Sequence, residues 1–126
     1  MAVNYSSALK SDRMQAVTNR LDAQSGNAYL EICTSGYALV LATIALAKPS
    51  FTESGGVLTM AGAPKSDTSA DNTGTAAVAR FKDSAGTVWL QGLTCGVGSG
   101  DIQLNSLSIT AGQTVTLTSA TITHSA

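Results

Sequence analysis

The second half of the chain consists of short segments in which apolar and polar residues alternate. These segments are residues 75–81, 87–93, 101–105 and 113–123, and they are separated by glycine, asparagine and aspartate. Alternation at every second position places the apolar side chains of a strand on one face and leaves the other face in water. The pattern predicts a mainly β protein, which we expect to be an antiparallel β-sandwich.

Residues 6–23 contain the clearest helical pattern of the chain, because apolar residues recur there close to the 3.6 period. Ser6 or Ser7 can cap the first turn, and Gly26 is a natural left-handed stop beyond the last turn. One apolar stripe predicts a helix that lies on the sandwich or on a neighbouring subunit. The stripe is formed by Leu9, Met14, Val17 and Leu21.

Three segments connect this helix to the second half. Residues 28–34 alternate, with Leu30 and Ile32 facing one way. Residues 38–47 have almost no polar alternation, so they form either a strand buried on both faces or a short helix, and their β-branched residues favour the strand. Residues 61–72 have turn residues without an apolar period. They predict a loop, either a crossover between the two sheets or a partner-binding loop.

The second half also predicts one hairpin and one irregular strand. Asp83 and Gly86 are suited to a turn that joins the first two alternating segments. Trp89 has the same parity as Leu93, and we expect it in the core or at a subunit interface. In the last strand the apolar parity changes near residues 118–119. This change predicts a β-bulge, or a strand that passes from one sheet to the other.

Composition restricts the partners of the chain. Only 12% of its 126 residues are charged, and the net charge is −1, so no broad basic field is present for binding nucleic acid. The most apolar stretch is too short to span a bilayer, and residues 1–5 do not begin a signal peptide. We therefore expect no nucleic acid or membrane partner and synthesis in a cytoplasm. We expect an N-terminal arm at 1–5 and one domain at 6–126.

Groups that could perform chemistry are few and scattered. The single histidine, His124, lies near the C-terminus, and Cys33 and Cys95 are expected to be free thiols. Residues 67–74 superficially resemble a calcium loop but lack its closing glutamate and its ligand spacing. We therefore predict no catalytic residue, no cofactor and no metal site. A sandwich of this kind acts by presenting a surface.

Three stretches, residues 70–77, 80–88 and 101–115, resemble a family of small proteins encoded among the structural genes of tailed bacteriophages and prophages. A short N-terminal helix is typical of that family. The resemblance implies a capsid decoration, or cement, protein on the outer surface of the virion head, a non-enzymatic clamp across capsid subunits. It also implies that the antiparallel β-sandwich is jelly-roll-like. The alternative that it leaves open is a tail- or fibre-associated structural or receptor-binding module.

The resemblance also implies partners. These are the major capsid protein and further copies of the chain, as a dimer or trimer. We expect the contacts to come from the N-terminal segment, the loop at 61–73 and the sheet face near the tryptophan. The candidate contact residues are Val3, Tyr5, Leu9, Pro64, Asp67, Asp71 and Trp89.

Overall fold

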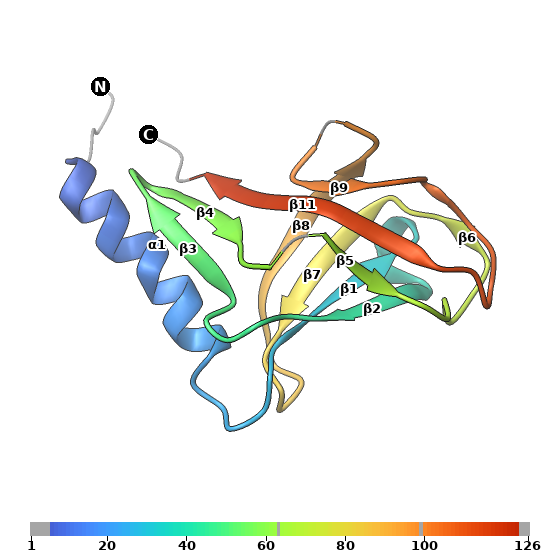
Figure 1. The fold of residues 1–126 in the computed structure, drawn as a ribbon, viewed down its shortest axis with the longest axis horizontal. Helices are drawn as coiled ribbons and strands as arrows, with labels where there is room; N and C mark the ends of the chain where they lie inside the picture. Colours follow the sequence, from blue (N-terminus) through green and yellow to red (C-terminus); the bar gives the residue numbers. More distant parts are fainter. Residues whose placement is uncertain (1–5, 63, 99, 124–126) are drawn as a thin grey trace.

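A computed structural model describes residues 6–62, 64–98 and 100–123 of the chain. These residues form a mainly β protein with one N-terminal helix, which confirms the coarse fold class (Figure 1). Helix α1 spans Ser7–Leu21, and a short 3-10 helix, η1, spans Ser35–Tyr37. The strands are β1 (Tyr29–Cys33), β2 (Val40–Ala45), β3 (Phe51–Ser54), β4 (Val57–Met60), β5 (Lys65–Asp67), β6 (Gly74–Thr75), β7 (Val78–Lys82), β8 (Val88–Gly96), β9 (Ile102–Leu104), β10 (Ser108–Ile109) and β11 (Val115–Thr123).

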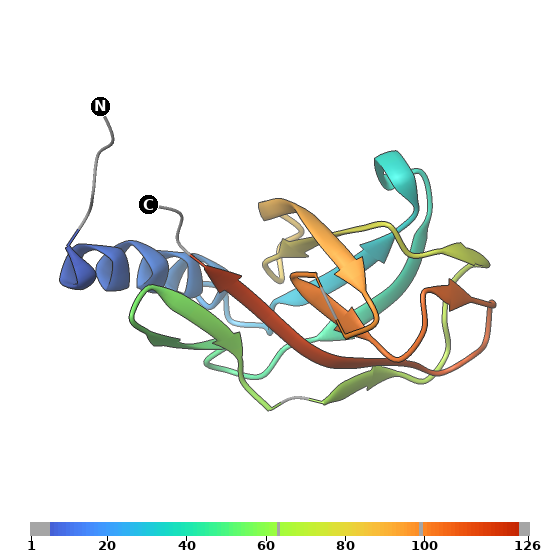
Figure 2. The same cartoon turned by 90° about the horizontal axis from the view of Figure 1, so that it is seen from above.

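Most of the described strands belong to one long sheet, in the order β2-β1-β7-β8-β9-β11-β4-β3, with β5 paired to β11. Strands β8 and β9 pair in parallel, whereas the other ladders are antiparallel. Strands β6 and β10 form a separate small ladder. Figures 1 and 2 together show that the long sheet curls into a half-barrel. This curled sheet encloses the core.

The core joins the two ends of this curled sheet. The rings of Phe51 in β3 and Phe81 in β7 meet edge to face, with their centroids 5.2 Å apart. Each fully buried leucine, isoleucine or phenylalanine side chain contributes roughly 1.5–3 kcal/mol through removal from water. The fully buried side chains around the two rings come from the helix and from strands on both sides. They include Leu21, Leu30, Ile32, Leu41, Ile44, Leu58, Ile102, Leu104 and Leu117.

Helix α1 begins with the cap that the sequence predicts. The Oγ atom of Ser6 accepts a hydrogen bond from the backbone N–H of Leu9 at 3.2 Å, which satisfies one free donor of the first turn. Met14 and Leu21 of the predicted stripe are buried, whereas Leu9 is 44% exposed. The later part of the helix therefore provides the packing against the sheet, beside β3 and β4 (Figure 1).

The predicted left-handed stop at Gly26 is wrong, because Gly26 does not have a positive φ. The helix, predicted over residues 6–23, ends at Leu21, and Asp22 is its C-cap, with its backbone N–H donating to the carbonyl oxygen of Thr18. The carboxylate of Asp22 accepts a hydrogen bond from the backbone N–H of Ser50 at 3.0 Å. Because this contact is with the residue that precedes β3, it ties the chain to the sheet directly after the last turn of the helix.

The segment at 38–47 is a strand, as favoured, but it is not buried on both faces. In β2, Leu41, Ala42 and Ile44 are buried, whereas Thr43 and Ala45 are exposed. The sheet has a core on its inner face, and no second layer covers this part of its outer face among the described residues. The apolar run at 38–47 does not indicate burial on both faces, because a small residue such as Ala45 can occupy an exposed position of a strand.

Register shifts set the parity of the long strands. The pairing of β11 with β9 shifts between Leu117 and Ser119, which confirms the predicted bulge. The pairing of β8 with β7 shifts twice, once on each side of Leu90, and the first shift includes Gly92, which has a φ of +77°. This register places Leu90 opposite Phe81 and Leu93 opposite Ala79, so both leucines pack against the core. The predicted common face of Trp89 and Leu93 is wrong, because the extra residue reverses the alternation.

The predicted loop at 61–72 contains strand β5, which pairs with β11. On its other side this segment is bonded to β2 largely by side chains. The Oδ2 atom of Asp67 accepts the backbone N–H of Thr43 at 3.0 Å, and the side-chain amide of Asn72 donates to the carbonyl oxygen of Val40 at 2.8 Å. The backbone N–H of Asp71 donates to Leu41 at 2.8 Å. These bonds cover the free edge of β2, which would otherwise be open to pairing with other chains.

Replacing Asp67 with alanine removes this bond to β2 and a second bond, from the backbone N–H of Ser69 at 3.0 Å. We expect Asp67→Ala to lower the free energy of unfolding by about 1–3 kcal/mol, since backbone donors lose their partner. Urea denaturation measures the change. The control is Asp12→Ala, an exposed carboxylate on α1, which should change stability by less than about 0.5 kcal/mol. Equal losses in the two variants would contradict a role of Asp67 at the edge of β2.

Candidate functional site

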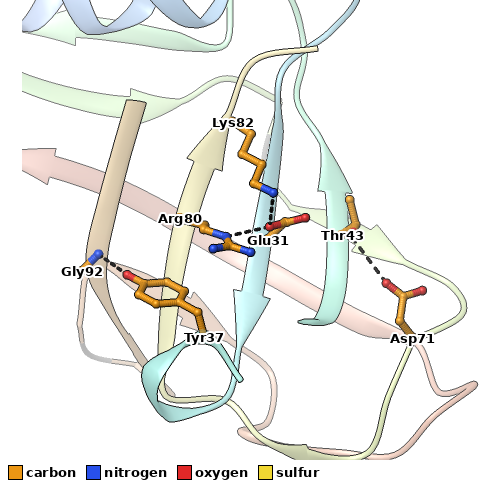
Figure 3. Close-up of polar contacts among 7 residues, drawn as sticks. All are labelled: Glu31, Tyr37, Thr43, Asp71, Arg80, Lys82 and Gly92. Carbon is orange, nitrogen blue, oxygen red and sulfur yellow. Dashed lines mark hydrogen bonds and ion pairs between the residues drawn. The ribbon is translucent and has the colours of Figure 1, made fainter. Parts of the chain in front are cut away.

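The outer face of strands β2, β1, β7 and β8 has a cluster of charged side chains. The strand register places Thr43, Glu31 and Arg80 in one row across the sheet. The Oε1 atom of Glu31 lies 2.7 Å from Nε of Arg80 and 3.0 Å from Nζ of Lys82 (Figure 3). These side chains are 12–22% exposed, so they are largely shielded. They form a compact ion-pair network on the outer face of the sheet.

Tyr37 extends this network from η1 to β8. Its aromatic ring lies 5.0 Å from the guanidinium carbon of Arg80, which is a cation–π contact. Its hydroxyl oxygen accepts the backbone N–H of Gly92 (Figure 3). Tyr37 has a φ of +59°, an uncommon conformation for a residue with a side chain. The network therefore spans β1, β7 and β8 and holds η1 against them.

The electrostatics of Glu31 follow from its neighbours. Burial raises the pKa of the Glu31 carboxyl, but hydrogen bonds from Lys82 and Arg80 outweigh it, and the pKa lies below its ordinary value of 4.5. A lowered carboxyl pKa means that the charged form stabilises the folded state. The arrangement is that of a structural ion pair. It does not hold a carboxyl in the protonated form that acid catalysis requires.

Trp89 stands apart from this network and is the largest exposed aromatic side chain described. It is 43% exposed, so the expectation of a core position is wrong. Its indole N–H donates to Oδ2 of Asp83 at 2.9 Å, and the guanidinium carbon of Arg20 lies 5.2 Å from its ring centroid. The neighbouring Val88 is 36% exposed. We call Val88 and Trp89, with Asp83 and Arg20 beside them, the Trp89 patch.

The hairpin turn holds the Trp89 patch in place. The Oδ1 atom of Asp83 accepts the backbone N–H groups of Ala85 and Thr87 at 3.0 Å each, as expected of a turn aspartate. Gly86 has a φ of +91°, which confirms its predicted left-handed position. Hydrogen bonds from Trp89, and then from the backbone of Thr87, lower the pKa of the Asp83 carboxyl. The turn thus fixes the orientation of an aromatic ring that solvent reaches.

The structure does not gather the remaining predicted contact residues at one place. Leu9 is exposed on α1, and Pro64 is exposed before β5. Asp67 is engaged with β2, and Oδ2 of Asp71 accepts the hydroxyl of Thr43 at 3.5 Å (Figure 3). Trp89 differs from these residues because it is an exposed aromatic side chain held by both a hydrogen bond and a cation–π contact. Val3, Tyr5 and His124 lie outside the described residues.

Most of the carboxylates serve the backbone. Of the eight acidic residues in the sequence, five accept a hydrogen bond from a backbone N–H group. In the described part of the chain, no group of three or more histidine, cysteine, aspartate or glutamate side chains could hold a metal ion. The five are Asp22, Glu53, Asp67, Asp83 and Asp101, and their donors include Ser50, Gly56, Thr43, Thr87 and Thr94.

The two cysteines are free thiols, with Cys33 buried and Cys95 half-buried. Burial raises the pKa of the Cys95 thiol to about 11 and also raises the pKa of Cys33. The thiolate is the reactive form, so neither cysteine is set up as a nucleophile near neutral pH. Within the described ranges, no helix has the length and apolar character needed to cross a membrane.

Comparison with known proteins gave no relative: no family model, no curated protein and no solved structure matches the chain.

Sequence reasoning missed the network of Glu31, Arg80, Lys82 and Tyr37. A signal was present, because Arg80 and Lys82 have the same parity in one strand and Glu31 alternates with buried residues in another. The signal identifies a network only if β1 is known to pair with β7. The sequence does not show this pairing, because Glu31 and Arg80 are 49 residues apart.

The ion-pair network should make stability depend on pH. We expect Glu31→Gln to lower the free energy of unfolding by about 1 kcal/mol near pH 7, because the cations lose their counter-charge. A carboxyl with a lowered pKa contributes above its ordinary pKa of 4.5, and the contribution is lost as pH falls through the lowered value. The difference between wild type and variant, followed by urea denaturation, should therefore shrink below about pH 4.5. A difference that does not change with pH would contradict this account, and Asp12→Asn is the control.

Proposed function

We propose that this protein is a non-enzymatic structural protein of a bacteriophage virion, a capsid decoration protein that binds the major capsid protein on the outer surface of the head. The observation that supports a binding role is the Trp89 patch. A large aromatic side chain is exposed there, yet a hydrogen bond and a stacked guanidinium hold it. The assignment to a virion, and to its head, rests on the sequence resemblance at residues 70–77, 80–88 and 101–115.

A held aromatic ring is well suited to contact another protein. Interfaces are enriched in tryptophan and arginine at the positions that contribute most to affinity. A ring that is already oriented loses little conformational entropy on binding. Here Asp83 accepts the indole N–H, so the polar atom of Trp89 is already satisfied when the ring face is buried. Val88 enlarges the apolar area beside it.

Self-association belongs to the same proposal. A dimer or trimer that contacts several capsid subunits gains effective concentration, so each contact can be modest. The low charge of the chain, with a net charge of −1, opposes the close approach of copies only weakly. A jelly-roll-like sandwich is the finer form of the fold that we propose. The edge-to-face contact between Phe51 in β3 and Phe81 in β7 supports it, because it joins strands that lie far apart in the order of the sheet.

Co-sedimentation with empty capsids of the phage that encodes the chain tests this function. We expect wild-type protein to sediment with capsids, and Trp89→Ala to weaken binding about 30-fold, which corresponds to a loss of about 2 kcal/mol. The control is Val97→Ala, since Val97 is 59% exposed and lies outside the Trp89 patch. Far-UV circular dichroism establishes that each variant is folded.

Two results would overturn the proposal. Wild-type protein that stays in the supernatant would remove the capsid as a partner. Label confined to the tail in electron micrographs of tagged virions would remove the head location and favour the tail- or fibre-associated module. Adhesion of the purified protein to host cells or glycans, without binding to capsids, would favour the receptor-binding form of that alternative.

A further inference from the structure

Three buried oxygen atoms where α1 meets β3 have no hydrogen-bond partner in the described part of the protein. They are Oγ1 of Thr18, Oδ1 of Asp22 and Oγ of Ser50. Thr18 is only 2% exposed, and Ser50 is fully buried. Native proteins leave few buried polar groups unpaired, because each one loses its bonds to water on folding. Three such atoms on neighbouring residues point to a bound group.

Hydrogen bonds of other atoms hold these three residues side by side. The backbone N–H of Asp22 donates to the carbonyl oxygen of Thr18 at 2.9 Å, and Oδ2 of Asp22 accepts the backbone N–H of Ser50 at 3.0 Å. The unpaired Oδ1 belongs to that same carboxylate. Thr18 and Asp22 are four residues apart, so their side chains leave the end of the helix on one side. Asp22 therefore lies next to Thr18 on the helix and next to Ser50 before β3, and the three unpaired oxygens do not bond one another.

We propose that a single water molecule binds in this region and bridges Thr18, Asp22 and Ser50. Buried waters commonly make about three hydrogen bonds to groups that are otherwise unsatisfied. The bridge joins the last turn of α1 to the residue that precedes β3. It does not rest on the proposed function, since it concerns how the helix is attached to the sheet.

The numbers of hydrogen-bond donors and acceptors among the three groups favour a bound water over a bound cation. The two hydroxyl groups each need an acceptor for their hydrogen, and the carboxylate oxygen needs a donor. A water molecule accepts from the hydroxyls of Thr18 and Ser50 and donates to Oδ1 of Asp22. A metal ion would satisfy the carboxylate, but it would leave both hydroxyl hydrogens without an acceptor.

The site also bears on the geometry of the Trp89 patch. Arg20, whose guanidinium lies over the ring of Trp89, stands between Thr18 and Asp22 in the chain. A water that fixes the last turn of the helix thereby fixes the backbone from which Arg20 extends.

A high-resolution crystal structure of the whole chain, from crystals grown with rubidium as the monovalent cation, tests the proposal directly. We expect one density peak within about 2.5–3.0 Å of all three oxygens, without anomalous signal from rubidium. An anomalous peak would identify a cation and overturn the assignment to water. Absence of any peak, or direct bonds among the three side chains, would also overturn it.

Thermal unfolding of variants provides a second test in solution. Thr18→Val keeps the shape of the side chain but removes one partner of the water, so we expect the melting temperature to fall by about 3–8 °C. Ser50→Ala should act similarly. If both act on one water, the double variant should lose less than the sum of the single losses. Strictly additive losses would overturn the bridge. Thr114→Val, at an exposed position, is the control for the loss of a hydroxyl.

Discussion

The contact between Phe51 and Phe81 is the interaction on which the rest of the structure depends. These two residues lie in β3, at one end of the long sheet, and in β7, two strands from the other end. Their rings can meet only if the sheet curls back on itself. The curl encloses the apolar residues of nearly every strand. It leaves strand edges whose backbone N–H and C=O groups need other partners.

Carboxylate side chains pair with backbone N–H groups that would otherwise be free at these edges and at turns. Carboxylates are scarce, and most of them accept backbone N–H groups at strand edges, turns and the end of the helix. Asp67 covers β2, Asp83 organises the hairpin, Asp101 accepts the backbone N–H of Thr94, and Asp22 ties the helix to the sheet. A carboxylate used in this way satisfies a donor that a neighbouring strand would otherwise pair. Asp22, Asp67, Asp83 and Asp101 therefore each have a structural role in the described part of the chain.

The Glu31 network and the Trp89 patch are two surface features of the described residues, and they differ in how completely their groups are paired. The network around Glu31 is self-contained, because each cation meets the carboxylate and the tyrosine stacks on Arg80. In the Trp89 patch, Asp83 binds the indole N–H and Arg20 lies over the ring, but Trp89 is still 43% exposed. The first is a structural device of the sheet. The second has the physical character of a contact site, and so it supports the proposed binding role.

Local patterns in the sequence determined the elements of this protein: the cap at Ser6, most of the strands, the turn at Gly86 and the bulge near Ser119 were all predictable. Each depends on residues that are neighbours in the chain, where side-chain periodicity and turn chemistry act directly. The tertiary structure alone decided which strands pair, and with that the fate of individual side chains. It turned part of the expected loop at 61–72 into β5, ended the helix before Gly26 and left Trp89 on the surface. Those outcomes depend on contacts between segments far apart in sequence, such as Asp22 with Ser50 and Thr43 with Asp67, and no local pattern encodes which distant partner a side chain will meet.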